Sequence, residues 1–250
     1  MTGDEKGCEA GVSGDENAVI NSGRISGTEI AHSLDQNGYA VLKGVISQSD
    51  CRALAGEYNA QDIYRSRVVM SRHGFGQGEY KYYDYPLPDL IASLRARLYE
   101  PLAEIGNKWN ALMNMDQRFP PTHQQYLDLC HAAGQTKATP LLLKYGAGDY
   151  NCLHQDVYGE LLFPLQVACL LSKPGQDFTG GEFVLTEQRP RMQSRAVVVP
   201  LDQGDAVVFP VRNRPKQGTR GTYRVNMRHG VSEVRSGHRH TLGIIFHDAQ

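Results

Sequence analysis

The residues with the clearest potential for chemistry are His154 and Asp156, a histidine and an aspartate separated by one residue. On a strand, residues i and i+2 point to the same face, so we expect this imidazole and this carboxylate to converge. A second histidine, His229, ends a segment from Tyr223 that reads as a strand. Two histidines and one carboxylate on a β scaffold suit a non-haem Fe(II) site with open coordination positions. The sequence therefore predicts an iron centre.

Other side chains compete for these roles. Three further histidines lie near the C-terminus: His238, His240 and His247. The first two flank Arg239, and on a strand they would face away from it, so we expect them on the opposite face of the sheet. A closed zinc site would need a fourth ligand, for which Cys152 is a weak candidate. Without a metal, His154 and Asp156 would form a structural hydrogen-bonded pair.

The candidate ligands fall in residues 139–250, where short apolar runs are separated by Gly, Pro and Asp. Short strands with regular turn signals predict a β-sandwich or barrel of the jelly-roll class, with about eight strands. No repeat or linker divides this half of the chain. We therefore expect a β core that carries the site.

The preceding residues, 23–138, have helical patterns, the longest over Leu90–Met113 and Thr122–Ala133, with Pro101 as a possible break. Residues 1–22 hold few large apolar groups and are expected to form a disordered tail. The predicted fold is α+β. A single domain would span residues 23–250, with residues 23–138 as helical and α+β support, including a strand over Tyr39–Ile46, and a possible lid.

Composition narrows the functional classes. The 250 residues include 26 Lys and Arg against 27 Asp and Glu, a formal net charge of −1. This balance argues against an obligatory polyanion binder with a basic surface throughout, while local patches stay open. No apolar run approaches the ~20 residues needed to cross a bilayer, and no signal peptide is recognisable, so a cytoplasmic protein is expected. Five cysteines without paired spacing indicate no disulfide framework.

Five features occur in a characteristic order: the His154–Asp156 pair, Gly180–Glu182, Gly204–Asp205, His229 and Arg239. In this order they resemble the Fe(II)/2-oxoglutarate-dependent dioxygenase superfamily, whose core is a double-stranded β-helix. More narrowly, the C-terminal half resembles a bacterial group regarded as oxidative demethylases of damaged DNA, related to AlkB-type repair dioxygenases. The set is specific for the superfamily and much less so for the substrate.

The resemblance implies Fe(II) as cofactor and 2-oxoglutarate and O2 as co-substrates. The implied iron ligands are His154, Asp156 and His229. Arg239 would bind the far carboxylate of 2-oxoglutarate through two charge-assisted hydrogen bonds, with help from Tyr145 and Thr241. AlkB-type enzymes carry an asparagine where this chain has Leu143. One co-substrate contact must therefore come from elsewhere or be absent.

A glycine-rich and aromatic segment, His73–Tyr85, lies outside this set. It would suit a mobile lid, with Tyr80 and Tyr82 as surfaces on which a flipped base stacks. The alternative is a loop that packs its tyrosines on the helices.

A basic segment, residues 189–239, holds 11 Lys and Arg against three acidic residues and could follow phosphates. Its candidate substrate residues are Arg189, Arg191, Arg212 and Arg214. The alternative is a solvated basic face balanced by the acidic tail.

Together these features predict an iron- and 2-oxoglutarate-dependent oxygenase that removes alkyl groups from nucleic-acid bases by hydroxylating an N-alkyl carbon, with alkylated DNA as partner. Hydroxylation of a small metabolite or a protein side chain is the alternative, in which the arginines would bind an acidic substrate. A non-catalytic metal or 2-oxoglutarate sensor is a third reading. The oligomeric state is left open.

Overall fold

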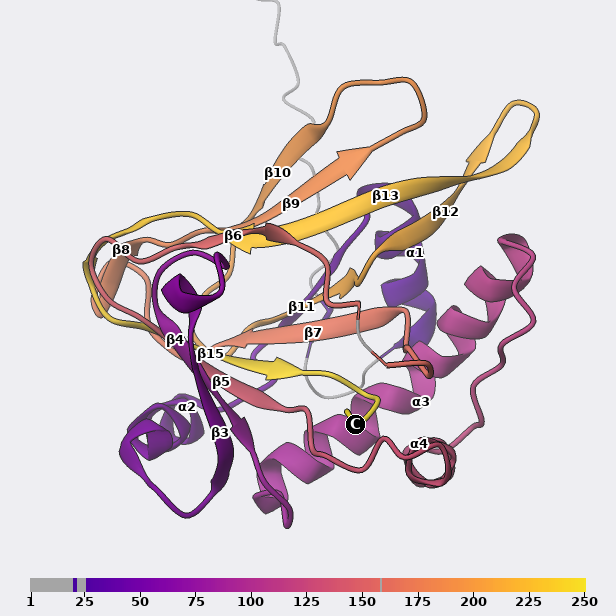
Figure 1. Cartoon of the computed structure of the whole chain (residues 1–250). Coiled ribbons are helices and arrows are strands. Elements are labelled where there is room, and N and C mark those ends of the chain that lie inside the picture. The colour runs from indigo at the N-terminus through magenta and orange to yellow at the C-terminus, as the bar shows by residue number, and fades with distance from the viewer. Residues whose placement is uncertain (1–19, 22–25, 158) are drawn as a thin grey trace, which may run out of the picture.

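The computed structural model describes residues 20–21, 26–157 and 159–250, which form two facing sheets with helices on one side (Figure 1). Residues 1–19 and 22 of the predicted tail lie outside the described residues. The prediction of a disordered tail is wrong for Ile20–Asn21, which form β1 and pair in parallel with β2 (Ala40–Lys43). No described helix is long and apolar enough to cross a membrane.

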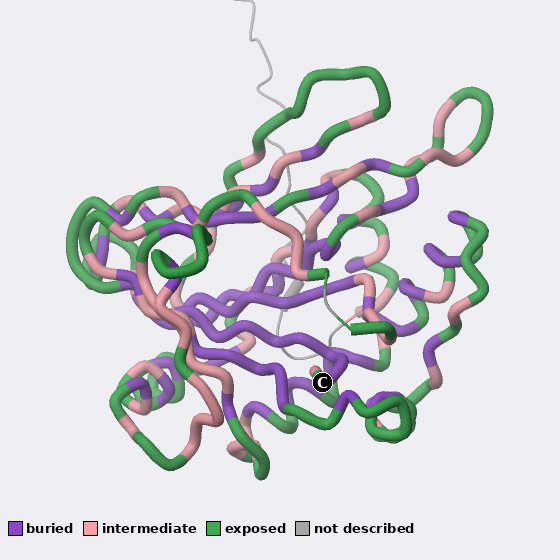
Figure 2. The backbone as a smooth tube through the Cα atoms, in the orientation of Figure 1, coloured by how far each residue is buried: buried purple, intermediate pink, exposed green. Residues whose placement is uncertain are grey.

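The larger sheet has eight strands in the order β1-β2-β11-β7-β15-β5-β4-β3. Its other strands are β3 (Tyr64–Val69), β4 (Glu79–Tyr83), β5 (Leu141–Tyr145), β7 (Leu165–Leu170), β11 (Ala206–Pro210) and β15 (Arg239–Ile244). All pairs except β1 with β2 are antiparallel. Figure 2 shows the central strands of this sheet as the most continuously buried part of the chain.

The smaller sheet covers one face of the larger one. Its strands are β9 (Phe183–Gln188), β10 (Arg195–Val199), β12 (Asn213–Gly218) and β13 (Gly221–Val231), with β6 (Asn151–His154) paired to β13. A two-stranded ribbon joins β8 (Phe178–Gly180) to β14 (Val234–Gly237). Phe183 and Leu185 from the smaller sheet pack against Val207 and Phe209 from the larger one. This is the predicted jelly-roll arrangement of two antiparallel sheets.

Helices cover the opposite face of the larger sheet. They are α1 (Gly27–Asn37), α2 (Gln48–Gly56), α3 (Asp89–Leu112) and α4 (His123–Ala132), with short 3-10 turns at Glu57–Asn59 and Met70–Arg72. Apolar residues of α3, such as Leu94 and Leu98, join Val167, Leu242 and Ile244 in one core. Because side chains alternate along a strand, the neighbours of these strand residues face the smaller sheet instead.

Two boundaries differ from the sequence predictions. The helix α3 continues through Pro101, so the predicted break is absent. The sheet also extends beyond the predicted core in residues 139–250, because β2, β3 and β4 come from the N-terminal half. Side chains cap two of the helices: the Ser47 hydroxyl accepts from the Asp50 amide at the start of α2, and Thr122 forms a capping box at α4. The α+β jelly-roll prediction is confirmed.

Candidate metal centre and cavity

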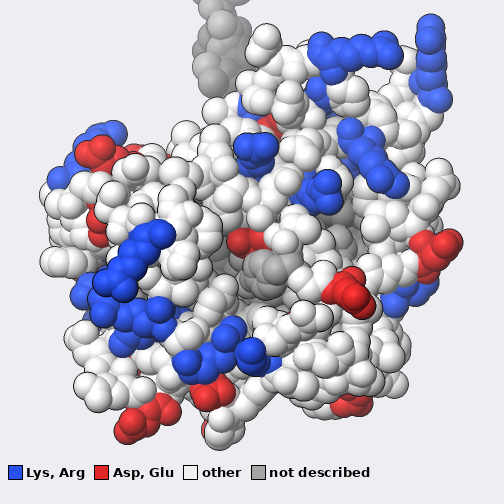
Figure 3. Space-filling view, viewed as in Figure 1, with Lys and Arg blue, Asp and Glu red and all other residues white. Residues whose placement is uncertain are grey.

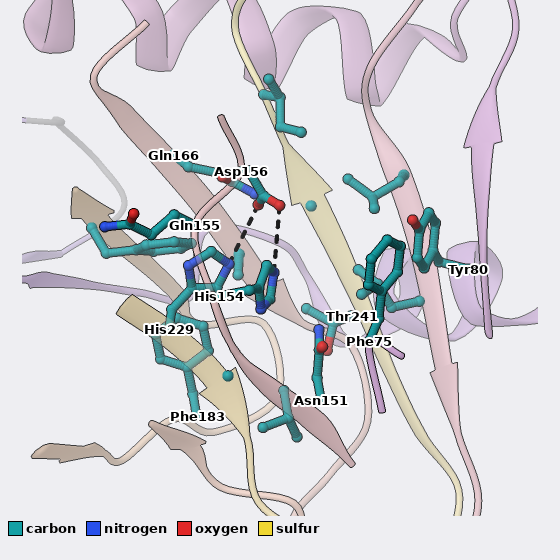
Figure 4. A pocket seen from close by; sticks show the side chains of 18 of the residues that line it. Phe75, Tyr80, Asn151, His154, Gln155, Asp156, Gln166, Phe183, His229 and Thr241 are labelled. Atoms are coloured by element: carbon teal, nitrogen blue, oxygen red, sulfur yellow. Dashed lines mark ion pairs between the residues drawn. The ribbon is translucent and has the colours of Figure 1, made fainter. Parts of the chain in front are cut away.

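Three side chains meet between the two sheets. His154 ends β6, and its register partner on β13 is His229. The Asp156 carboxylate lies 3.4 Å from the Nε2 atom of each histidine, and the three potential ligand atoms lie within 4.8 Å of one another (Figure 4). Asp156 follows the strand rather than continuing it, so the strand-parity argument fails for this residue although the convergence is as expected.

Local contacts orient the two imidazoles. The Nδ1 atom of His154 is 2.7 Å from the carbonyl oxygen of Cys152, so it donates there and leaves Nε2 as the ring atom that faces Asp156. The His229 ring is buried and lies 4.6 Å from the Phe209 ring and 6.2 Å from the Phe183 ring, between centroids. The pair therefore presents both Nε2 atoms on the side of the carboxylate.

The electrostatics of the cluster favour an ionised carboxylate and one neutral histidine. Burial lowers the pKa of His229, and the neighbouring His154 lowers it further. Burial also opposes the charge on His154, but the hydrogen bond and charge of Asp156 outweigh it, so the pKa of His154 is raised. Burial works against the Asp156 charge as well, yet the two histidines hold the pKa of this carboxyl well below its usual range. A bound divalent cation would stabilise the ionised Asp156 carboxylate in place of the histidines.

Arg239 provides a second charged group in the same space. Its side chain is 2% exposed, and its Nη1 atom donates to the Thr241 hydroxyl at 2.5 Å. The guanidinium carbon lies 5.6 Å from the centre of the Tyr145 ring, opposite Arg239 in the register of β15 and β5. Burial lowers the pKa of Arg239 to about 10, which leaves it cationic at neutral pH. Among the described residues, its buried Nε has no hydrogen-bond partner.

The glycine motif before β9 has a direct role beside Arg239. Gly181 has a φ of 63°, and a Cβ there would lie 2.9 Å from the Cδ atom of Arg239. Only glycine adopts this conformation readily while letting the chain pass so close to the arginine stem. The motif thus helps to enclose the guanidinium.

A cavity of about 290 Å³ joins these groups. Its walls include the three candidate metal ligands, Arg239, Tyr145 and Thr241, so the structure brings together every predicted metal and co-substrate residue. It also contains polar residues that the sequence reasoning missed: Asn151, Gln155 and Gln166. The Asn151 side-chain amide donates to the Tyr145 hydroxyl at 3.5 Å, which places an amide in the co-substrate region although Leu143 replaces the expected asparagine.

The predicted lid is partly a strand. Tyr80 and Tyr82 lie on β4, in register with Leu143 and Leu141 of β5, so they do not belong to a mobile loop. Both tyrosines nevertheless line the cavity, and Phe75, which is 45% exposed, joins them. The aromatic surface is therefore present, carried mainly by the sheet.

The four predicted basic residues do not line the cavity. The prediction that Arg214 binds substrate is wrong. Its side chain is 1% exposed, pairs with Glu187 at 2.5 Å and donates to the Leu34 carbonyl of α1. Arg189 also pairs with Glu187, at 2.7 Å. Arg191 and Arg212 are exposed. Figure 3 shows Lys and Arg side chains on several sides of the central hollow of this face.

Comparison with solved structures identifies the fold. A 2OG-Fe(II) oxygenase family oxidoreductase from Burkholderia pseudomallei has a TM-score of 0.51 at 15% identity, over 93% of this chain and 97% of that one. A prolyl hydroxylase from Trichoplax adhaerens, in complex with a hypoxia inducible factor peptide, has a TM-score of 0.52 at 12% identity, over 89% of each chain. The fold is therefore that of the class of oxygenases that use Fe(II), 2-oxoglutarate and O2, as expected from the sequence.

Sequence comparison identifies the family. The model of a family described as oxygenases catalysing oxidative methylation of damaged DNA matches residues 78–249, and the chain belongs to this family. "Uncharacterized protein Rv2227" of Mycobacterium tuberculosis is 45% identical over 197 residues, 79% of each chain. The protein is thus an oxygenase, and the predicted relationship to the damaged-DNA group is confirmed.

Removing a candidate ligand should strongly weaken metal binding. We expect His154→Ala and Asp156→Ala each to weaken binding of Fe(II), or of Mn2+ as a redox-stable substitute, by more than about 100-fold, because two ligands cannot replace three. Metal content after gel filtration, with far-UV circular dichroism as a check on folding, measures this. Cys152→Ala is the control, since that exposed thiol neighbours His154 and should retain full binding. Normal metal content in either ligand variant would overturn the assignment.

Proposed function

We propose that this oxygenase uses Fe(II) and 2-oxoglutarate to demethylate alkylated nucleic-acid bases. The observation that carries the proposal is the His154, Asp156 and His229 cluster, which shares one cavity with a buried arginine and with aromatic side chains. The family description, which names damaged DNA, supports the choice of substrate class.

The cluster fits a divalent iron ion. Two imidazole nitrogens and one carboxylate oxygen converge within 4.8 Å, and the His154 tautomer is set by the Cys152 carbonyl. Bound there with 2-oxoglutarate and O2, the iron supplies the oxidising power to insert oxygen into a substrate C–H bond. His154, Asp156 and His229 hold it and leave part of its coordination sphere open to the cavity.

Arg239 fits the distal carboxylate of 2-oxoglutarate. Its buried guanidinium keeps its charge, has an unpartnered Nε among the described residues, and is braced by Thr241. A planar guanidinium in a water-poor pocket binds a carboxylate strongly and with a defined orientation. Tyr145 and its Asn151 partner border the same region and restrict how the co-substrate lies.

The substrate side of the cavity suits a planar ring. Phe75, Tyr80 and Tyr82 offer aromatic surfaces near the metal cluster, on which an extruded base can stack. Replacing a C–H bond of an N-methyl group by C–OH gives an N-hydroxymethyl base. Breaking its C–N bond returns the proton of the hydroxyl to the base nitrogen and releases formaldehyde.

Product analysis tests the proposal directly. Fe(II)-loaded protein with 2-oxoglutarate and O2 should form succinate, and methylated single-stranded DNA should stimulate it with one formaldehyde for each turnover above background. Succinate is measured by chromatography and formaldehyde by derivatisation. Unmethylated DNA of the same sequence is the control. Succinate that no methylated oligonucleotide stimulates would contradict demethylation and favour a metabolite or protein substrate, and no succinate at all would favour a sensor.

Arg239→Met should act on the co-substrate. Met fills similar space but forms no ion pair, so we expect the 2-oxoglutarate Kd to rise about a hundredfold while Mn2+ binding is retained. Isothermal titration of the Mn2+ form with 2-oxoglutarate measures the change. Arg235→Met, at an exposed arginine of β14, is the matched control. An unchanged Kd in Arg239→Met would contradict the assigned role.

The exposed arginines should affect DNA affinity. We expect Arg191→Glu with Arg212→Glu to weaken binding of single-stranded DNA and to lower the slope of log K against log salt by about 1.4, the share of two phosphate contacts. Arg52→Glu with Arg97→Glu makes the same change in net charge on α2 and α3, where both side chains are exposed, and should leave the slope unchanged. Equal effects of the two pairs would rule out a local phosphate contact.

A further inference from the structure

The cavity has a second polar end, opposite Arg239. Arg239, Thr241 and Gly243 follow one another at alternate positions along β15, and Ile245 continues the row, all lining the cavity. Ile245 lies six positions beyond Arg239, a span of about 20 Å at the rise of a strand. In the register of β7 with β15, Val167 pairs with Ile244, which places Gln166 beside Ile245. Gln166 therefore lies at the end of the cavity remote from the candidate 2-oxoglutarate site.

Gln166 is a buried polar residue with unmet hydrogen-bonding capacity. Its side chain is 6% exposed, and its Oε1 atom has no hydrogen-bond partner among the residues that the structure describes. A buried acceptor without a partner costs about 1–3 kcal/mol, so proteins rarely keep one without a use. Its neighbour across the strands, Phe209, offers no polar group. The amide is thus available to a ligand.

The surroundings determine which atom of the amide is offered. Figure 4 shows Gln166 beside Asp156, and Thr241 and Asn151 farther from it. An ionised carboxylate only accepts hydrogen bonds, so of the two amide atoms of Gln166 only the nitrogen can donate to Asp156, and the Oε1 atom has no partner among the described residues. The free atom is then an acceptor, in the same cavity as the three candidate metal ligands.

We propose that the Gln166 side-chain oxygen accepts a hydrogen bond from an amino group of the substrate base, and that this contact selects among methylated bases. The inference rests on the proposed demethylation. On a six-membered ring, a methylated nitrogen and the adjacent amino-bearing carbon direct their substituents to the same side. A methyl group that faces the metal therefore brings the amino group to Gln166, whereas a carbonyl at that position meets the amide oxygen and is repelled.

Binding to four oligonucleotides tests the proposal without turnover. Short single-stranded DNAs carry 1-methyladenine or 3-methylcytosine, in which an amino group adjoins the methylated nitrogen, or 1-methylhypoxanthine or 3-methylthymine, in which a carbonyl adjoins it and no amino group does. Fluorescence anisotropy with the Mn2+ and 2-oxoglutarate-bound protein gives each Kd. We expect the wild type to bind the amino pair roughly tenfold more tightly, the scale of one buried hydrogen bond. Gln166→Met, close in volume, should bring that ratio to about one.

Controls separate recognition from other roles. Gln166→Met should bind Mn2+ and 2-oxoglutarate normally and keep its thermal stability, and Gln166→Leu repeats the measurement in case methionine disturbs packing. Gln124→Met, at an exposed position of α4, should keep the wild-type ratio.

Each outcome is decisive. A ratio lost only in the Gln166 variants supports the proposal. A ratio unchanged in them, or their loss of Mn2+ or 2-oxoglutarate binding, overturns the role of Gln166 and leaves demethylation standing. A wild type that neither binds nor demethylates any of the four DNAs overturns both proposals.

Discussion

The pairing of β6 with β13 is the constraint on which the rest of the site depends. It sets His154 opposite His229 across two strands that are far apart in sequence, and the short segment after His154 then folds Asp156 back to both rings. The buried rings of Phe183 and Phe209 pack against the His229 ring and restrict its orientation. A shift of one residue in this register would turn one histidine to the opposite face of the smaller sheet and leave no site.

In the larger sheet, the alternation of side chains along each strand also determines which residues line the cavity. Along β7, Val167 and Cys169 enter the core with the helices, while Gln166 and Ala168 line the cavity. Near the cavity end of β15, the buried Arg95 of α3 fixes the chain by donating to the Ile245 carbonyl at 2.8 Å and pairing with Asp248 at 2.7 Å. The helices are therefore more than a cover, because they position the strand that carries Arg239.

The sequence was most informative where chemistry is encoded by residue type and spacing. The histidine and aspartate pair, the second histidine and the arginine all meet in one cavity, and the jelly roll forms as predicted. Long-range strand pairing could not be predicted from the sequence: β4 pairs with β5, so part of the predicted lid is a strand. The ion pair of Arg214 with Glu187 could not be predicted either, because Glu187 belongs to a different strand. Gln166 had a local signal, a lone polar residue within an apolar strand.

The distribution of charge explains why recognition should depend on the cavity. The net charge of the chain is −1, and some of its arginines are used internally: Arg95 binds Asp248, and Arg214 binds Glu187. Contacts to phosphates add affinity without reading the base. Discrimination between a damaged and an intact base must then come from groups that meet the base itself. Within the cavity these are aromatic faces and a small number of amides, among which a buried acceptor without a partner is the most selective, because a base that leaves it unpaired loses the most free energy.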